Sequence, residues 1–229
     1  MQNAFVLHRR RFKNSSLIIE LFSQTAGRVT VISKGALRQK NYLAGTLQPF
    51  IPLSVNYVGR SQIKTLVNAE ENAPSIMLTG DKLYCGLYLN ELLIRLIQKE
   101  ISVEPLFKLY HHTLLQLLKS NKIDVVLRYF ELGLLEALGY QLPLIYEADS
   151  QKKIMADNHY LFYLERGALP CSADHQQKIS GATLIALQEK TLEQSLHRQQ
   201  AKQLLRTTLH HYLGYRHLKT KQLMIKIRK

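Results

Sequence analysis

The chain has little cysteine, no tryptophan and no long apolar run. Its two cysteines, Cys85 and Cys171, lie far apart in unlike contexts, which argues against a disulfide framework and is typical of a reducing compartment. No stretch approaches the roughly 20 apolar residues that a membrane span needs, and the first residues lack the apolar core of a signal peptide. We therefore predict a cytoplasmic protein without a membrane partner.

The sequence motifs of common enzymes are also missing. There is no GxxxxGK[ST] loop, no GxSxG turn and no HExxH helix. Acidic residues are sparse in the first third of the chain, where a nuclease would gather carboxylates around magnesium. Two cysteines cannot build a cysteine-based zinc site, and His210 and His211 would point about 100° apart on a helix. We expect no enzyme activity, no cofactor and no metal.

Acidic residues are scarce at both ends of the chain, although the formal net charge is +14. Residues 1–64 contain ten Lys/Arg and one acid, Glu20, and residues 198–229 contain nine Lys/Arg and no acid. Residues 65–197 contain twelve basic and sixteen acidic residues. Nucleic acid is the first candidate partner for such ends, because neutralising phosphates releases counterions. A basic surface that only maintains solubility is the alternative.

What the sequence does contain, in its first seventy residues, is a series of short alternating apolar runs. The central stretch from Gly27 to Phe50 is a strand followed by a glycine-bounded basic loop that returns to a second strand. Other runs cover 3–11, the residues from Leu17, about 50–58 and the residues from Ile63. Five short antiparallel strands split by one long basic loop predict a small β-barrel.

The apolar period changes after Pro74 from that of strands to that of helices. Between 140 and about 180 the signal weakens, with a predicted hairpin in which 153–155 and 160–163 flank Asp157-Asn158. The fold class is therefore α+β, a five-stranded barrel followed by an α-helical domain with a small irregular insert containing a hairpin. The predicted domains are 1–79 and 80–229, with the insert at 140–179, and the predicted helices are 81–99, 105–119, 123–138, 180–190 and 199–212.

Ten cations on the predicted barrel and its loops form the candidate binding surface. Alternation places Arg9 and Arg11 on one strand face and Arg10 on the other, so these three cannot all contact one ligand. Phe5, Phe22 and Tyr57 are candidates for base stacking but are more often core residues, whereas Tyr42 lies in the polar loop. The ten are Arg9, Arg10, Arg11, Lys13, Arg28, Lys34, Arg38, Lys40, Arg60 and Lys64.

Two polar residues, Asn90 and Glu91, interrupt a nearly apolar helix. An unpaired carboxylate there would be costly, and Arg128 on another helix is the expected ion-pair partner. The functional alternative is that Arg128 lies at a groove edge and receives an acidic peptide by charge-assisted pairing.

Motifs in the same order along nearly the whole chain carry a family resemblance: AFVLHRR, SLIIELFSQTAGRVTVISKGALR, GTLQPFIPL, GLYLNELLIRL, LRYFELGLLEALGY and YLGYRHLKTKQL. The chain resembles the RecO family of bacterial DNA repair proteins. The resemblance implies an N-terminal OB-fold and a helical domain. It also implies a recombination mediator that binds single- and double-stranded DNA and anneals complementary strands without ATP. Such a protein recognises the C-terminal tail of single-strand-binding protein (SSB) and, with RecR, helps load RecA.

The resemblance would place DNA on the barrel, at positions such as Arg28, Lys34, Arg38 and Lys40, and the SSB tail at Arg128. Many RecO-like proteins carry a four-cysteine zinc module where 140–175 lies here, but this segment contains only Cys171. The chain is therefore similar to the zinc-free members. Two alternatives stay open: a scaffold that binds SSB and RecR with only incidental DNA contact, and an unrecognised hydrolase.

Overall fold

The computed structural model describes residues 1–38 and 43–220. These residues form two compact units, one of Met1–Asn121 together with the segment from His217, and one of Lys122–Arg216. We call them unit 1 and unit 2. The change from strands to helices falls between Glu71 and Gly80, close to the predicted domain boundary, but the first two long helices pack with the barrel in unit 1. The division at residue 79 stays a prediction.

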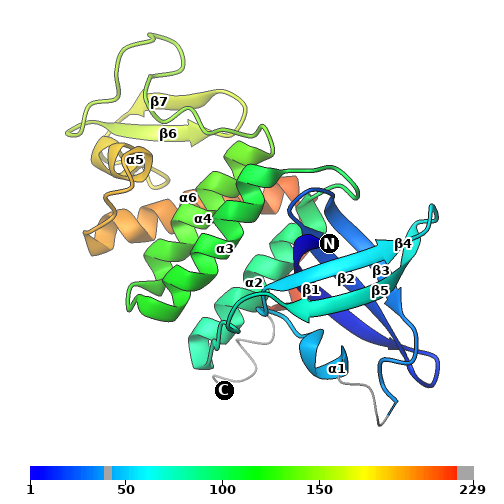
Figure 1. The fold of residues 1–229 in the computed structure, drawn as a ribbon. Coiled ribbons are helices and arrows are strands. Elements are labelled where there is room, and N and C mark those ends of the chain that lie inside the picture. Colours follow the sequence, from blue (N-terminus) through cyan, green and yellow to red (C-terminus); the bar gives the residue numbers. More distant parts are fainter. Residues whose placement is uncertain (39–42, 221–229) are drawn as a thin grey trace. The chain divides into compact units, whose positions relative to one another are not determined.

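Unit 1 contains a closed five-stranded barrel with the strand order β1-β2-β3-β5-β4 (Figure 1). The fold class is thus confirmed. One pairing differs from the expectation, because β3 and β5 run parallel whereas the other neighbouring pairs are antiparallel. The long loop and short helix α1 (Leu43–Thr46) between β3 and β4 allow this closure. The strands are β1 (Gln2–Phe12), β2 (Ser16–Ser23), β3 (Gly27–Ser33), β4 (Leu53–Val58) and β5 (Ile63–Glu71).

Alternation along the strands fills the barrel with aliphatic side chains, among them Ile19, Leu21 and Val31, all fully buried. Strand β1 changes face at a bulge between Val6 and His8. A bulge leaves one residue outside the ladder and bends the strand.

Helices α2 (Gly80–Leu96) and α3 (Glu104–Lys119) lie side by side next to the barrel within unit 1 (Figure 1). Phe5 and Phe22 are buried against Phe107 and Tyr110, with ring centroids 5.3 to 5.9 Å apart. A second core therefore joins the outer face of β1 and β2 to α3. Pro105 stands in the first turn of α3, where its missing amide is tolerated.

The connector between α2 and α3 runs along the first residues of β3. The Glu100 amide donates to the Arg28 carbonyl at 2.9 Å. Gly27 has a φ of +65°, and a Cβ there would lie 1.9 Å from the Ile101 carbonyl oxygen. Only glycine allows the backbone this close approach.

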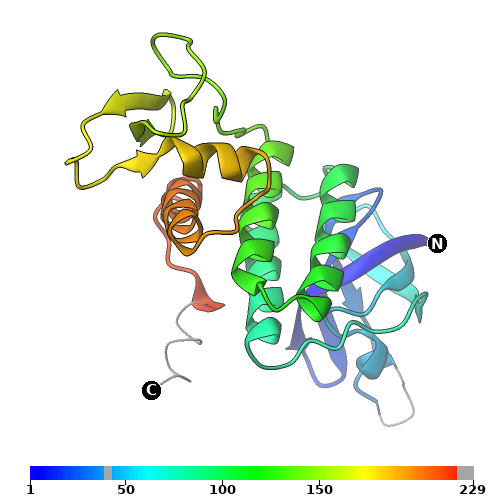
Figure 2. The same cartoon turned by 90° about the vertical axis from the view of Figure 1, so that its left-hand side faces the viewer.

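Unit 2 combines helices with a small sheet of order β7-β6-β8. Figure 2 shows α5 beside α6, and α6 also packs on α4. No helix within the described ranges is long and apolar enough to cross a membrane. The elements are α4 (Ile123–Ala137), β6 (His159–Tyr163), β7 (Gly167–Cys171), β8 (Ile179–Ser180), α5 (Gly181–Gln188) and α6 (Ser195–Tyr212).

The predicted hairpin around Asp157-Asn158 is wrong in its pairing. Strand β6 pairs with β7 through a turn at 164–166, and Lys153 forms only an isolated bridge with Tyr146. The backbone at 156–158 is instead tied to α5, because the Asn158 carbonyl accepts from the Gly181 amide at 2.8 Å. The two runs flanking Asp157 are therefore held by different neighbours.

A buried carboxylate, Glu147, holds the insert together. It accepts hydrogen bonds from the hydroxyls of Ser150 and Tyr160, and Tyr160 in turn accepts from the Met155 amide at 3.0 Å. Among residues 1–38 and 43–220, no group of three or more His, Cys, Asp or Glu side chains could hold a metal ion. Hydrogen bonds and packing organise this part of the described chain.

Candidate nucleic-acid interface

Exposed cations gather at the end of the barrel where β1 turns into β2. The register aligns Arg11 with Leu17 and Leu17 with Ser33, so the end of β3 lies level with this turn. The Leu37 amide donates to the Ser15 carbonyl at 3.0 Å, which holds the loop after β3 against the turn. We call the exposed side chains of this region the hairpin-end cations: Arg10, Arg11, Lys13, Lys34 and Arg38.

The loop after β3 depends on a glycine. Gly35 has a φ of +69°, in the left-handed region, and its carbonyl accepts from the Arg38 amide at 3.1 Å. The Arg38 side chain folds back over it, 3.5 Å from where a Cβ would lie. This tight turn places Lys34 and Arg38 on the same short loop.

The hairpin-end cations form no ion pair with any residue that the structure describes. Their charges are hydrated and repel one another, so a polyanion gains from each of them without breaking an existing bridge. An acidic ligand would be attracted equally well by charge alone. Several cations at one barrel end suit the many phosphates of a nucleic acid better than a single carboxylate.

Three of the ten sequence candidates are engaged within unit 1. Arg9 donates to the Ala44 carbonyl at 2.6 Å, and burial lowers the pKa of Arg9. Arg28 lies 3.6 Å from Glu20 and donates to the Ile97 carbonyl. Lys64 pairs with Glu100 at 2.9 Å. These side chains fasten the connector and α1 to the barrel rather than standing free for a ligand.

Arg60 is exposed on the β4–β5 turn, away from the hairpin end, and lines a shallow hollow with Lys99. Lys99 was missed by the sequence reasoning, because it belongs to the helical part of the chain and reaches Arg28 only through the connector. Lys40, the remaining candidate, lies outside the described residues.

The four aromatic candidates for base stacking lie in different surroundings. Phe5 and Phe22 are core residues beneath α3, and Tyr57 is half-buried against the barrel interior. Tyr42 lies outside the described residues. Of the three rings that the structure describes, two are buried and one is half-buried, so none of them is exposed for base stacking.

The two polar residues of α2 have separate roles. Asn90 is buried, donates to the Leu7 carbonyl at 3.0 Å and accepts from the Tyr110 hydroxyl at 2.6 Å. Leu7 lies at the β1 bulge, where the ladder is interrupted, so Asn90 satisfies a carbonyl that the barrel leaves open. Burial raises the pKa of Tyr110, which stays a neutral donor.

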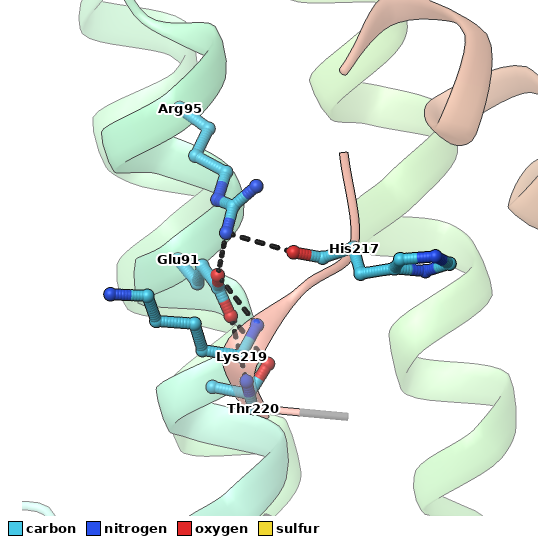
Figure 3. Close-up of polar contacts among 5 residues, drawn as sticks. All are labelled: Glu91, Arg95, His217, Lys219 and Thr220. Atoms are coloured by element: carbon cyan, nitrogen blue, oxygen red, sulfur yellow. Dashed lines mark hydrogen bonds and ion pairs between the residues drawn. The ribbon is translucent and has the colours of Figure 1, made fainter. Parts of the chain in front are cut away.

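The predicted Glu91–Arg128 ion pair is wrong. Glu91 pairs with Arg95 at 2.6 Å, one turn along α2, and accepts from the Lys219 and Thr220 amides at 2.9 Å each (Figure 3). Arg95 donates to the His217 carbonyl at 3.0 Å. Burial raises the pKa of Glu91, but these hydrogen bonds and the Arg95 charge outweigh it and lower the pKa overall. The segment from His217 to Thr220 thereby docks on α2.

Arg128 finds its partner three residues away on its own helix. Its guanidinium lies 2.5 Å from Glu131, and the side chains are only 8% and 2% exposed. The Arg128 Nε is buried without a hydrogen-bond partner among the described atoms. The cation predicted to receive an acidic tail is thus buried and already paired, with one donor position unfilled.

A closed OB-like barrel with exposed cations at one end, continued by helices, defines an α+β protein of the OB-barrel class. Comparison with known families identifies the particular family within this class. The family described as Recombination protein O N terminal matches residues 1–73, and Recombination protein O C terminal matches residues 77–222. The chain belongs to the RecO family of DNA repair proteins.

Curated relatives agree over the full length. A DNA repair protein RecO from Methylococcus capsulatus is 39% identical over 223 residues, covering 97% of this chain and 92% of the relative. The same-named protein from Nitrosococcus oceani is 38% identical and covers 100% of this chain and 94% of its own. That from Coxiella burnetii is 37% identical, with 98% and 97% covered. The resemblance drawn from the motifs is confirmed.

Proposed function

We propose that this protein is a recombination mediator that acts in the cytoplasm as a binding protein and not as an enzyme. It binds single- and double-stranded DNA, anneals complementary strands without ATP, docks on the C-terminal tail of SSB and, with RecR, helps load RecA. The observation that carries the DNA-binding part is the exposed, unpaired group of hairpin-end cations on an OB-like barrel.

Annealing needs no nucleotide in this mechanism. Two complementary strands repel through their phosphates, and cations that bind one strand reduce that repulsion for the other. Base pairing then supplies the free energy. The protein's contribution is charge screening and a raised local strand concentration.

The direct test replaces Lys13, Lys34 and Arg38 together by Gln. We expect weaker binding of single-stranded DNA and a flatter salt dependence, by about 0.7 in log–log slope for each lost phosphate contact. The measurement is a salt titration of fluorescence anisotropy. The control replaces three exposed lysines elsewhere, Lys119, Lys152 and Lys153, and removes the same charge. Equal losses in both variants would reduce the effect to net charge and remove the barrel site.

For the SSB tail we retain Arg128 as the receiving cation. The tail's carboxylates would bind at the open Nε position while Glu131 keeps its bond to the guanidinium Nη2. Both buried charges then stay paired before and after binding, which avoids the cost of an isolated buried ion.

Two substitutions at Arg128 separate tail binding from folding. Arg128→Lys keeps the charge but loses the forked donor geometry, so we expect a folded protein with weaker binding of an SSB tail peptide. Arg128→Ala leaves Glu131 without this ion-pair partner, and we expect destabilisation by about 3–5 kcal/mol. Tail-peptide titration and denaturant unfolding measure the two effects. Unchanged peptide affinity in the folded Lys variant would exclude Arg128 from the tail site.

A scaffold that binds SSB and RecR with only incidental DNA contact would behave differently. Its DNA binding would show a shallow salt slope that the Lys13, Lys34 and Arg38 substitutions leave unchanged. Annealing of SSB-coated strands would then fail only when the tail site is altered.

A further inference from the structure

Unit 2 has its own exposed rings, gathered where α6 ends. Tyr140, which follows α4, stacks on Tyr212 with the ring centroids 3.9 Å apart and the planes at 21°. Tyr140 remains 43% exposed, so part of this ring pair is open to solvent. A partly exposed pair of stacked rings offers a surface on which a base can stack.

A third ring extends the group. Tyr215 is 65% exposed and has a φ of +59°, immediately after Gly214 at +63°. Its amide donates to the His210 carbonyl at 2.9 Å, which closes the end of α6. The ring lies edge-on to His210 and His211, and its hydroxyl is 3.2 Å from the His211 Nδ1.

The turn that closes the end of α6 holds Tyr215 in this left-handed conformation and leaves most of its ring in solvent.

Cations stand before and after Tyr212 and Tyr215 in the sequence. Lys202 and Arg206 are exposed one helical turn apart on α6, and exposed Arg216 follows Tyr215 directly. None of these three forms an ion pair with a described residue, whereas Arg198, nearer the start of α6, pairs with Asp124. No acidic residue occurs after Glu193. Carboxylates from this part of the sequence therefore do not neutralise the three cations.

We propose that these residues form a second binding site for single-stranded DNA, separate from the barrel. We call it the tyrosine site: Tyr140, Tyr212, Tyr215, Lys202, Arg206 and Arg216. Unpaired bases would stack on the exposed rings, while phosphates would contact the cations on either side. The proposal rests on the proposed function, since it supplies the place for a second strand.

Helix polarity sets where along the site the phosphates and the bases lie. The C-terminal end of α6 carries partial negative charge, which disfavours a phosphate directly beside Tyr212. Uncharged base faces suit that position. Phosphates belong one or two turns back, at Lys202 and Arg206, and beyond the helix end, at Arg216. A duplex hides its base faces and gains only the charge contacts, so the site selects single strands.

A chain with both sites holds two strands at once. That would make annealing a reaction between strands bound to the same protein, with an effective concentration set by the chain rather than by the solution.

Stoichiometric titration with an oligothymidylate of about ten nucleotides tests the proposal, since this length suits one small site. We expect two equivalents bound by the wild type and one by Tyr140→Ala/Tyr215→Ala. Each lost ring should weaken the second site roughly fivefold to a hundredfold. Tyr140→Phe/Tyr215→Phe keeps the rings and should keep both equivalents. The matched control is Tyr146→Ala/Tyr163→Ala, which removes two rings of unit 2 that are 47% and 50% exposed.

A local readout comes from photocrosslinking. An oligonucleotide with 5-iododeoxyuridine should crosslink to Tyr140 or Tyr215 in the wild type. Two equivalents retained by the Tyr140→Ala/Tyr215→Ala variant, or the absence of such crosslinks, would overturn the tyrosine site. If the Lys13, Lys34 and Arg38 variant retains two equivalents while the tyrosine variant retains one, the tyrosine site stands and the barrel site of the proposed function fails.

Discussion

At the scale of single residues, a buried polar side chain in unit 1 satisfies a backbone carbonyl that the barrel leaves without a partner. Asn90 connects the bulge of β1 to Tyr110 of α3 through two hydrogen bonds. A buried amide with both ends satisfied fixes one arrangement of strand and helix, because a shifted register would leave several groups unpaired.

Asn90→Leu should destabilise unit 1 by about 1–3 kcal/mol, since the Leu7 carbonyl and the Tyr110 hydroxyl would lose their partners. The measurement is urea unfolding followed by circular dichroism. Tyr110→Phe in the same background removes the stranded hydroxyl, so the two changes together should cost less than their sum. Additive costs would show that the three groups are not coupled.

Sequence reasoning identified Asn90 and Glu91 as out of place in an apolar helix, and both are indeed hydrogen-bonded. It chose the wrong partner for Glu91. The Arg95 contact follows from helical spacing, whereas the amides of Lys219 and Thr220 are separated from Glu91 by well over a hundred residues and leave no trace in local pattern. Long-range backbone contacts of this kind require the fold.

At the scale of elements, the docked segment from His217 to Thr220 depends on an ionised Glu91. The pKa of Glu91 is below its ordinary value in the folded protein, so its contribution to docking is present at neutral pH. It is lost as the pH falls through this lowered pKa.

We expect the amide proton shifts of Lys219 and Thr220 to titrate together, at a pH below the ordinary glutamate range, in an NMR pH series. Glu91→Gln should abolish this transition because a neutral amide does not ionise there. A transition that persists in the Gln variant would assign it to another group.

Strand alternation was enough to place the five barrel strands, because each exposes one face and buries the other. It did not reveal the parallel pairing of β3 with β5 or the partner of β6. Both depend on which segments the rest of the chain brings alongside. The hairpin-end cations were visible in the sequence, but three of the ten candidates proved to be engaged with neighbouring groups.

At the scale of the whole molecule, unit 1 is built from two separate stretches of chain, with unit 2 between them in sequence. Ending the chain at Arg216 would remove the second stretch. We expect faster amide exchange in α2 and unchanged exchange in α4 to α6, measured by hydrogen–deuterium exchange. Faster exchange throughout unit 2 would contradict this, since it would mean that the removed segment also supports unit 2.

This interrupted order has a consequence for synthesis. As the chain leaves the ribosome, the barrel with α2 and α3 emerges first, and every residue of unit 2 must follow before His217 to Thr220 appear. Until then Glu91 and Arg95 lack the backbone groups of residues 217–220 as hydrogen-bond partners. A nascent chain that stalls late in translation would therefore carry a formed barrel and a nearly finished second unit, but an α2 on which the segment from His217 is not yet docked.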